Sequence, residues 1–541
     1  MFTRTPLHFD LAQRDRALAT GGIGVVHELA KQVGLFESID RRVHVLKAHK
    51  PYHESDHALN FAYSALCGGQ TIEDLELLRK NEAYLDLLGA QRIPDPTTAG
   101  DFCRRFTIDA VAELQAAINE SRLRVWARQP EAFFAKATID FDGTYVATDG
   151  ERREGVDINY KGEWSYHPLV ASLANTREPL EIENRRGNRP SHEGAAEMAD
   201  RTIALVRKAG FRSVLLRGDT AFSQSQHLDR WHEDGVEFIF GYAANTPLVM
   251  QAANLPNASW TPLKRKKRGS GSELQRSPRE NHRKAIVEER GYKNLRLERE
   301  DVAEMRYQPS ACSREFRMVV LKKTIEVRRG QLELEPETVF FFYITNRDAD
   351  SPSAVVLQAN QRCNQENLLA QLKGGVHSLR APVDTLVANW AYMVMTAIAW
   401  SLKAWLALVL PTKGRWSERR EEERDRVLKM EFRTFLNWMI RIPAQVLRTG
   451  RRTVVRFLAG RHCSQRCFAV RTPCARCAAD DDRAEALRER TDEPRRTRRT
   501  RRSEVDWTIR PCRLAAEDEL VPALRHTHLR SPAIRIRLFE G

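Results

Sequence analysis

Residues 137–146 read ATIDFDGTYV, and apolar and polar side chains alternate along this stretch. In an extended chain Ile139 and Phe141 point to one face, whereas Asp140 and Asp142 point to the other. The pattern predicts a β-strand with one buried face and with acidic side chains close to its end. A carboxylate beside a buried strand is costly unless it has a charged partner or a metal ion, so both aspartates are candidate functional residues.

The chain continues as an alternation of predicted strands and helices. A second strand from about Tyr166 to Leu173 is expected to pair with the first as a hairpin, and a helix is expected to end at about Ala209. The apolar run 214–216 and the segment 238–241 predict two further strands. This order of elements predicts an α/β fold in which helices flank a sheet.

Two further acidic residues follow the same logic. Asp219 comes directly after the apolar run 214–216, and Glu366 lies in a segment predicted to be helical. At 100° per residue, Arg362 lies about 40° from Glu366 around that helix, and Lys373 lies about 20° away on the other side. One helix face therefore presents a carboxylate between two cations, and such cations suit the phosphates of a bound strand.

Carboxylates at two strand ends and on a helix make a set of oxygen ligands. Oxygen ligands favour Mg²⁺ or Mn²⁺ over zinc, and two such ions about 4 Å apart can activate an attacking oxygen and stabilise a leaving oxygen. Asp142, Asp219 and Glu366 are therefore predicted as catalytic residues and as ligands of two Mg²⁺ or Mn²⁺ ions. Asp140 is the second choice for the first acid.

The composition points to a polyanionic partner. The 541 residues include 87 Lys and Arg against 72 Asp and Glu, a formal net charge of +15. Such an excess favours nucleic acid as the partner. Two basic runs are predicted to contact phosphates, although a solvated loop is an equally good interpretation of either one alone. They are Lys264, Arg265, Lys266, Lys267 and Arg268, and the Arg-rich segment 495–502.

Other features bear on the cellular compartment. The nine cysteines are scattered along the chain and are expected to be reduced, and the first 22 residues lack the apolar stretch of a signal peptide, so a cytoplasmic location is expected. The most apolar segment, 390–410, contains Lys403 and is predicted to be a buried core helix rather than a membrane span. Four cysteines between 463 and 477 leave a zinc site open as an alternative to incidental cysteines.

Three segments resemble the acidic motifs of bacterial insertion-sequence transposases of the DDE type. They read IDFDGT at 139–144, LLRGDT at 215–220 and NQRCNQEN at 360–367. The chain is similar to the family numbered thirteen-eighty, within the superfamily numbered four. Segments 187–194 and 389–393 resemble that family too, so the resemblance runs from about residue 10 to about residue 455. The family's Asp before a small residue and Thr favours Asp142 over Asp140.

The resemblance implies a ribonuclease H-like catalytic core with a mostly β insertion between the second Asp and the Glu. A helical N-terminal DNA-binding domain would precede the core, and helices would follow it, from about 354 to 410 and from about 417 to 447. Short strands are expected near 318–321, within the insertion, and near 339–344, directly after it. The expected boundaries are 1–130 for the N-terminal domain, 131–250 for the first part of the core, 251–338 for the insertion, 339–455 for the second part of the core with the C-terminal helices, and 456–541 for a basic, poorly ordered tail.

The resemblance also implies cut-and-paste transposition, with metal-dependent cleavage at the element's ends and strand transfer into target DNA. The implied partners are double-stranded DNA, as terminal inverted repeats and target, and a second subunit in a dimer on synapsed ends, all at the bacterial nucleoid. The superfamily signature Y-x2-R-x3-E-x6-K is matched by Arg362, Glu366 and Lys373, but Ala359 stands at its Tyr position and leaves that role unassigned. Two alternatives stay open: a catalytically silent DNA-binding derivative, and a metal-dependent nuclease without strand transfer.

Overall fold

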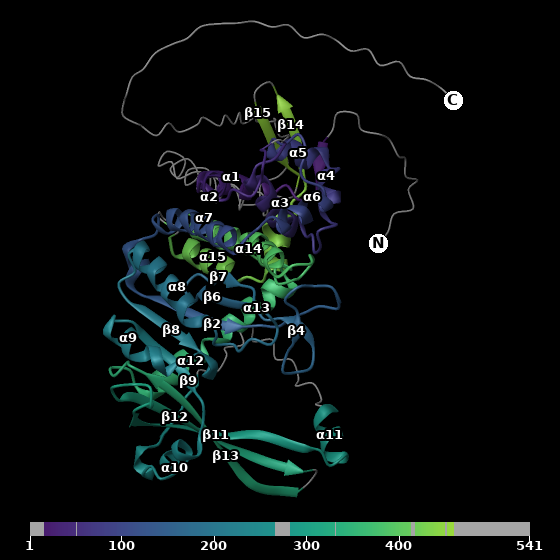
Figure 1. Cartoon of the computed structure of the whole chain (residues 1–541). Coiled ribbons are helices and arrows are strands. Elements are labelled where there is room, and N and C mark those ends of the chain that lie inside the picture. Colours follow the sequence, from purple (N-terminus) through teal and green to yellow (C-terminus); the bar gives the residue numbers. More distant parts are fainter. Residues whose placement is uncertain are drawn as a thin grey trace, which may run out of the picture. The chain divides into compact units, whose positions relative to one another are not determined.

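The computed structural model of the chain describes residues 16–49, 51–265, 282–329, 332–412, 417–449 and 452–458. Its largest element is a nine-stranded mixed sheet in the order β10-β11-β12-β13-β9-β8-β2-β6-β7 (Figure 1). Helices precede, interrupt and follow the strands along the chain. The predicted α/β class is confirmed.

Five strands carry or flank the acidic residues. β2 pairs antiparallel with β6, and β6 pairs antiparallel with β7, so the predicted pairing of the first two strands is confirmed. On its other side β2 runs parallel to β8, which runs parallel to β9. Parallel strands end at the same edge of a sheet, so the end of β2 and the turn after β8 lie together. The bounds are β2 (Ala137–Gly143), β6 (Leu169–Leu173), β7 (Glu178–Glu183), β8 (Val214–Gly218) and β9 (Glu237–Tyr242).

Between β2 and β6 the chain forms a separate three-stranded sheet in the order β3-β5-β4. Its strands are β3 (Val146–Ala147), β4 (Asp157–Ile158) and β5 (Trp164–Tyr166). The predicted second strand was placed from Tyr166, but Tyr166 ends β5 and the strand of the large sheet begins at Leu169. The break falls at Pro168, which has no N–H to donate to a strand ladder.

The segment expected as an insertion extends the large sheet rather than forming a sheet of its own. β13 pairs antiparallel with β9, with Phe342 opposite Tyr242 and Thr345 opposite Ile239. The strands run far beyond the short segments expected. Their outer halves do alternate, as at Leu295 and Leu297, but charged residues fill the positions between, and these two leucines are about half exposed. The elements are β10 (Thr261–Pro262), α11 (His282–Glu289), β11 (Lys293–Tyr307), β12 (Phe316–Arg329) and β13 (Leu332–Thr345).

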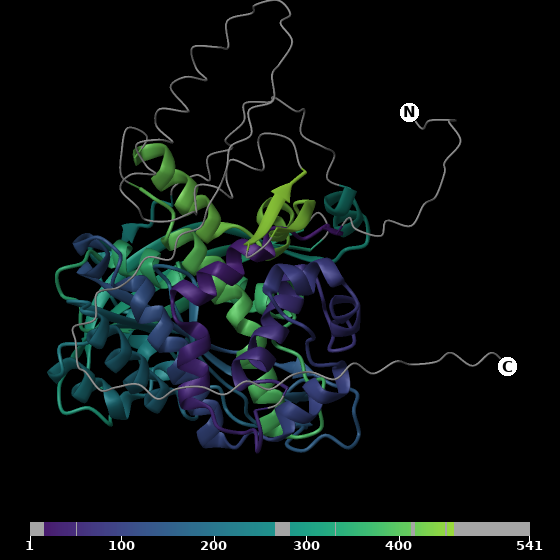
Figure 2. The same cartoon turned by 90° about the horizontal axis from the view of Figure 1, so that it is seen from above.

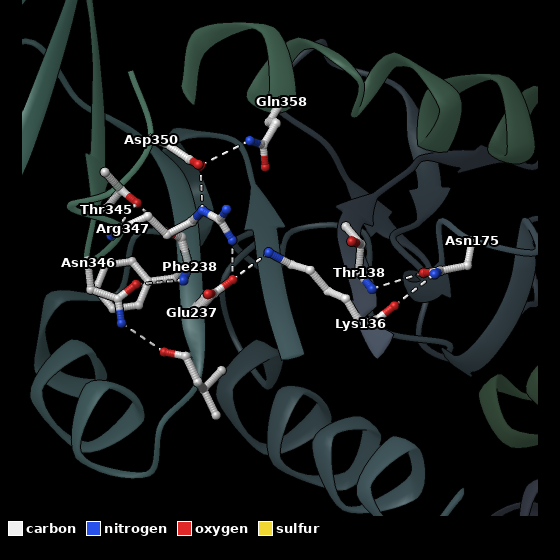
Figure 3. A network of polar contacts seen from close by, with 11 residues as sticks. Lys136, Thr138, Asn175, Glu237, Phe238, Thr345, Asn346, Arg347, Asp350 and Gln358 are labelled. Atoms are coloured by element: carbon white, nitrogen blue, oxygen red, sulfur yellow. Dashed lines mark hydrogen bonds and ion pairs between the residues drawn. The ribbon is translucent and has the colours of Figure 1, made fainter. Parts of the chain in front are cut away.

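A polar network fixes the place where the chain returns from these strands to helix α12 (Pro352–Asn360) (Figure 3). Glu237 at the start of β9 forms an ion pair with Arg347, which also pairs with Asp350 at 2.7 Å. Asn346 accepts a hydrogen bond from the backbone N–H of the residue after Glu237 at 3.0 Å. Gln358 of α12 donates to Asp350 at 3.0 Å. The start of β9, the end of β13 and α12 are thus held together.

Residues 23–126 form the expected run of helices. These helices do not have a core of their own, because their buried side chains belong to one hydrophobic cluster with the sheet and with helix α14. Helices α3 and α7 pack on α14, and Figure 2 shows the purple and blue N-terminal helices beside the green C-terminal ones. The N-terminal elements are α1 (Ile23–Gln32), α2 (Leu35–Arg42), α3 (Glu54–Cys67), α4 (Leu75–Arg79), α5 (Glu82–Leu88), α6 (Pro96–Arg104) and α7 (Ile108–Trp126).

The C-terminal part departs from the expected helices. Helical structure ends at Ile440, and β14 (Ala444–Thr449) follows, paired with β15 (Arg452–Phe457) and with β1 (Arg16–Leu18). The predicted helix to about residue 447 is therefore wrong beyond 440. Pro443 stops the helix, and the partner strand β1 lies at the opposite end of the sequence. The remaining helices are α8 (Ala195–Ala209), α9 (Leu228–Glu233), α10 (Thr246–Ala253), α13 (Cys363–Gly374), α14 (Leu386–Leu408), α15 (Ser417–Lys429) and α16 (Phe432–Phe435).

Helix α14 is the one described helix that is long and apolar enough to cross a membrane, and the window that meets this test is entirely buried inside the protein. It begins where the Thr385 side chain accepts a hydrogen bond from the N–H of Ala388. The burial agrees with the predicted core helix. Lys403 lies within it, donates to the backbone oxygen of Leu428 at 3.1 Å, and lies 3.9 Å from the ring centroid of Trp400.

We expect Lys403→Met to raise the free energy of unfolding near neutral pH. Burial and, to a smaller extent, the charge of Arg177 together lower the pKa of Lys403 from 10.5 to about 7. The unfolded lysine keeps its proton to about pH 10, so wild-type stability should rise relative to the variant by up to about 1.4 kcal/mol per pH unit between the two pKa values. Denaturant unfolding of both proteins across this range measures the difference. Parallel pH profiles would contradict the prediction.

A buried carboxylate joins α7, β7 and α14. Glu178 accepts hydrogen bonds from Arg122 Nε at 3.0 Å, from Trp126 Nε1 at 3.0 Å and from Trp405 Nε1 at 2.7 Å. Arg122 and Glu178 are both almost fully buried. The opposite charges and the hydrogen bonds from the tryptophans therefore compensate for burying Arg122 and Glu178 in the hydrophobic cluster.

Candidate active site

Asp142 is the penultimate residue of β2, and its side chain is 15 % exposed. The Arg362 guanidinium donates from Nη1 to Asp142 Oδ2 at 3.1 Å, and its Nη2 lies 3.5 Å from Oε1 of Glu366. One cation therefore bridges the carboxylate at the end of β2 and the carboxylate on α13.

Asp219 follows β8 directly and caps the short turn after it. Its Oδ1 accepts a hydrogen bond from the N–H of Ala221 at 2.9 Å. The turn lies close against β9, since a Cβ added to Gly241 would stand 2.9 Å from the Thr220 nitrogen. A glycine at 241 thus lets the turn that carries Asp219 lie against its neighbouring strand.

A buried amide orients the helix that carries Glu366. Gln365 of α13 donates from Nε2 to the backbone oxygen of Val170 at 3.1 Å and accepts a hydrogen bond from the hydroxyl of Ser172. Both partners lie on β6, the antiparallel neighbour of β2. Gln365 therefore docks α13 on the sheet, so that Arg362 reaches the end of β2.

The three predicted acids lie within electrostatic reach of one another. The pKa of Asp142 is raised to about 6, chiefly by burial and also by the negative charges of Asp219 and Glu366, while the Arg362 charge acts to lower it. Arg362 contacts two of the three carboxylates, so the group carries a net negative charge when all three are ionised. Such a group is prepared to bind a cation.

Within the ranges that the structure describes, no group of three or more His, Cys, Asp or Glu side chains stands at metal-ligating separation. The Arg362 guanidinium supplies a counter-charge between Asp142 and Glu366. The donor chemistry nevertheless fits a hard divalent ion, because every acidic ligand offers oxygen, and because a bound cation would relieve the repulsion that raises the pKa of Asp142.

Asp140, the second choice for the first acid, is engaged in a buried ion pair. Arg217 donates from Nε and Nη2 to its two carboxylate oxygens at 2.7 and 2.8 Å. The two residues are register partners on β2 and β8. Arg217 also donates from Nη1 to the backbone oxygen of Gln358 at 2.8 Å. One guanidinium thus ties together β2, β8 and the end of α12, the elements that lead to the three acids.

Asp140→Asn is expected to distinguish the two candidates for the first acid. The substitution leaves Arg217 buried without its counter-charge, so the free energy of unfolding should fall by about 3 kcal/mol. Cleavage of DNA by the folded fraction should fall far less than in Asp142→Asn. Denaturant unfolding and a cleavage assay on both variants measure this. If Asp140→Asn lost cleavage as fully as Asp142→Asn while keeping its stability, Asp140 would be the first acid.

Of the predicted phosphate-binding residues that the structure describes, some have a hydrogen-bond or ion-pair partner and one is exposed to solvent. Lys373 Nζ donates a hydrogen bond to the backbone oxygen of Tyr145 at 2.6 Å, and Tyr145 lies three residues after Asp142. Arg265 pairs with Glu300 through two contacts of 2.5 and 2.9 Å. Lys264 is exposed. Outside the described residues lie Lys266, Lys267, Arg268, the Arg-rich segment 495–502 and the four cysteines between 463 and 477.

Sequence reasoning missed Arg217 and Gln365. Arg217 stands two residues before Asp219, as Asp140 stands two residues before Asp142, and this matched spacing on parallel strands is a signal that could have suggested the pair. Gln365 carries no such signal, because a single glutamine beside Glu366 reads as an ordinary surface residue of a helix.

A mixed sheet that gathers carboxylates from two strand ends and a helix is suited to metal-dependent phosphoryl transfer. The sequence model of the family described as "Transposase DDE domain group 1" matches residues 15–472. The chain therefore belongs to this family of DDE transposases, whose domains generally depend on divalent metals.

One solved structure similar to the chain is a cryo-EM structure of the piggyBac transposase synaptic complex with hairpin DNA. The identity is 10%, the TM-score is 0.32, and the match covers 79% of this chain and 84% of that chain. No curated protein matches the chain.

Proposed function

We propose that the chain is a DNA transposase that cleaves insertion-sequence ends and transfers the cut strand into target DNA, with Asp142, Asp219 and Glu366 as its catalytic acids. The observation that carries the proposal is their convergence: Asp219 and Glu366 both act on the pKa of Asp142, and Arg362 bridges two of the three. Family membership supports the reaction class.

The sheet supports a ribonuclease H-like core. Its central strands run in the order β7-β6-β2-β8-β9, with β2, β6 and β7 antiparallel in sequence and β8 and β9 parallel to β2. The first acid then lies on the central strand and the second after the next parallel strand. This arrangement is the one expected from the motifs of the insertion-sequence family.

Asp142, Asp219 and Glu366 would hold two Mg²⁺ or Mn²⁺ ions, which supply activation of the attacking oxygen and stabilisation of the leaving oxygen when bound. Arg362 offsets part of the charge of Asp142 and Glu366 in the structure, and with metal ions bound at these acids its guanidinium would be available to bind a phosphate. Lys373 is held close to Asp142 by the Tyr145 carbonyl and offers a second positive charge to the strand.

The expected partners are double-stranded terminal inverted repeats, target DNA and a second subunit that brings two ends together. The net charge of +15 supports a DNA partner. Lys264, in the described start of the basic run, is exposed and so accessible to a DNA phosphate. A bacterial cytoplasm, at the nucleoid, is the location proposed with this function.

The test is incubation of the purified chain with Mg²⁺ and a labelled duplex that carries the inverted repeats flanking its gene. Cleavage at the repeat end followed by joining to a second duplex is the expected result. Cleavage without joining would favour the metal-dependent nuclease, and binding without cleavage would favour the silent DNA-binding derivative. The absence of both binding and cleavage would overturn the proposed function.

A further inference from the structure

An exposed aromatic ring lies at the tip of the small sheet that follows β2. Tyr160, in the turn between β4 and β5, is 80% exposed. Its ring meets Tyr145 edge to face, with 5.6 Å between centroids, and Tyr145 stacks on His167 at 4.1 Å. We call these three rings the aromatic ladder: Tyr160, Tyr145 and His167.

The inner end of the ladder adjoins the candidate active site. His167 lies against Gly143, where an added Cβ would be 2.6 Å from its Nε2. Gly143 is the residue after Asp142. The backbone oxygen of Tyr145 accepts the hydrogen bond from Lys373. The ladder therefore leads from the end of β2 to a ring that is open to solvent.

Two cations accompany the ladder. Lys161 Nζ lies 5.6 Å from the Tyr160 ring centroid, and Lys161 and Lys373 interact with each other electrostatically. In the part of the chain that the structure describes, neither lysine forms an ion pair with a carboxylate. Two like charges held near each other favour an anion beside them, although Lys373 also interacts with the charge of Asp142.

One acidic residue of the same loop, Glu154, is held elsewhere. The N–H of Glu154 donates to the backbone oxygen of Asp384 at 2.8 Å, and a Cβ on Gly155 would stand 3.1 Å from Leu386 at the start of α14. Residues 154–155 are thereby anchored at α14, whereas residues 160–161 lie by Tyr145 and Lys373. Glu163, the acid of the hairpin beside Lys161, accepts a hydrogen bond from Asn159 Nδ2 at 3.3 Å.

We propose that Tyr160, Lys161, Tyr145 and Lys373 form a binding subsite for one unpaired nucleotide of the DNA strand held at Asp142. The base stacks on the open face of Tyr160, and the two lysines hold the adjoining phosphates. Every base has a π-face, so this subsite accepts any base and requires only that the nucleotide be unstacked. The inference rests on the proposed function, because the strand is its DNA substrate.

The test measures stacking without cleavage. An oligonucleotide with 2-aminopurine in a single-stranded end, and a blunt duplex of the same sequence, are titrated with Asp219→Asn protein in Ca²⁺. We expect quenching of the single-stranded probe. Adding Tyr160→Ala should abolish the quenching and weaken binding of that probe roughly 5- to 150-fold, while blunt-duplex binding changes less than about twofold. Tyr160→Phe should restore quenching, because it keeps the ring.

Two further variants sharpen the result. Lys161→Ala should reduce the slope of log affinity against log salt for the single-stranded probe by about 0.7. Tyr292→Ala, which removes another exposed tyrosine on the segment before β11, is the matched control and should bind both probes as the parent does.

The inference would be overturned if Tyr160→Ala weakened both probes equally or neither. It would also be overturned if Tyr160→Ala changed the sedimentation of the free protein, because the hairpin would then be a subunit contact. Failure of the proposed function is seen separately, as absence of cleavage by the wild-type chain in Mg²⁺.

Discussion

Replacing Asp219 with asparagine is expected to abolish cleavage of the insertion-sequence ends and to leave DNA binding unchanged. The amide oxygen of asparagine can still accept the hydrogen bond from Ala221, so the turn after β8 is kept. The substitution removes one of the three charges proposed to hold the metal ions. Loss of a residue that merely supports a metal ligand costs about 10- to 100-fold, so loss of a ligand should cost more than that.

Cleavage rates in Mg²⁺ and gel-shift affinities for the inverted-repeat duplex measure the two effects. Asp200→Asn is the matched control, because Asp200 is a half-exposed carboxylate on α8 that pairs with Arg230. It should cleave as the wild type does. Normal cleavage by Asp219→Asn would remove Asp219 from the active site.

The second large effect is expected on stability. Glu178→Ala removes the carboxylate that pairs with Arg122 in the described part of the chain and leaves two tryptophan N–H groups, of Trp126 and Trp405, without their acceptor. A buried charge left without its partner costs about 3–5 kcal/mol. The free energy of unfolding should therefore fall by that amount, and the protein should unfold at a clearly lower denaturant concentration.

Glu28→Ala provides the comparison, since Glu28 pairs with Lys31 on the surface of α1. Exposed pairs contribute about 0–1 kcal/mol, so this variant should unfold much as the wild type does. Similar unfolding of the two variants would mean that the buried pair adds little to stability. Glu178→Gln, which keeps an acceptor for the tryptophans, separates the charge from the hydrogen bonds.

Much of the catalytic part of the fold could be predicted from the sequence. Alternation at Ile139 and Phe141 located β2, and the apolar run before Asp219 located β8, because both strands bury a face against helices. The motifs placed Glu366 on a helix, and in the structure its charge acts on the pKa of Asp142. What the motifs could not show is that Arg362 bridges Asp142 and Glu366, since side-chain contacts depend on how α13 docks.

Strand pairings between distant parts of the chain could not be predicted from the sequence either. β14 was predicted as helix because its partner β1 lies more than 400 residues earlier, with Arg16 opposite Val446, and local patterns do not contain that information. The length of β11 to β13 was missed for a different reason. Their outer halves alternate apolar and charged residues, as at Leu295 and Leu297, but these leucines stay about half exposed, so the pattern resembles that of a charged loop.

The length of the insertion also determines how long after Asp219 the ribosome adds Glu366. Asp142 and Asp219 are made first, and Glu366 follows Asp219 by 147 positions, after β9 to β13 and α12. At ordinary translation speeds the third acid emerges roughly 7–30 s after the second. A chain that stops within the insertion therefore holds two acids, no helix α13 and no Arg362. Such truncated products should be unable to cut the DNA of the cell that makes them.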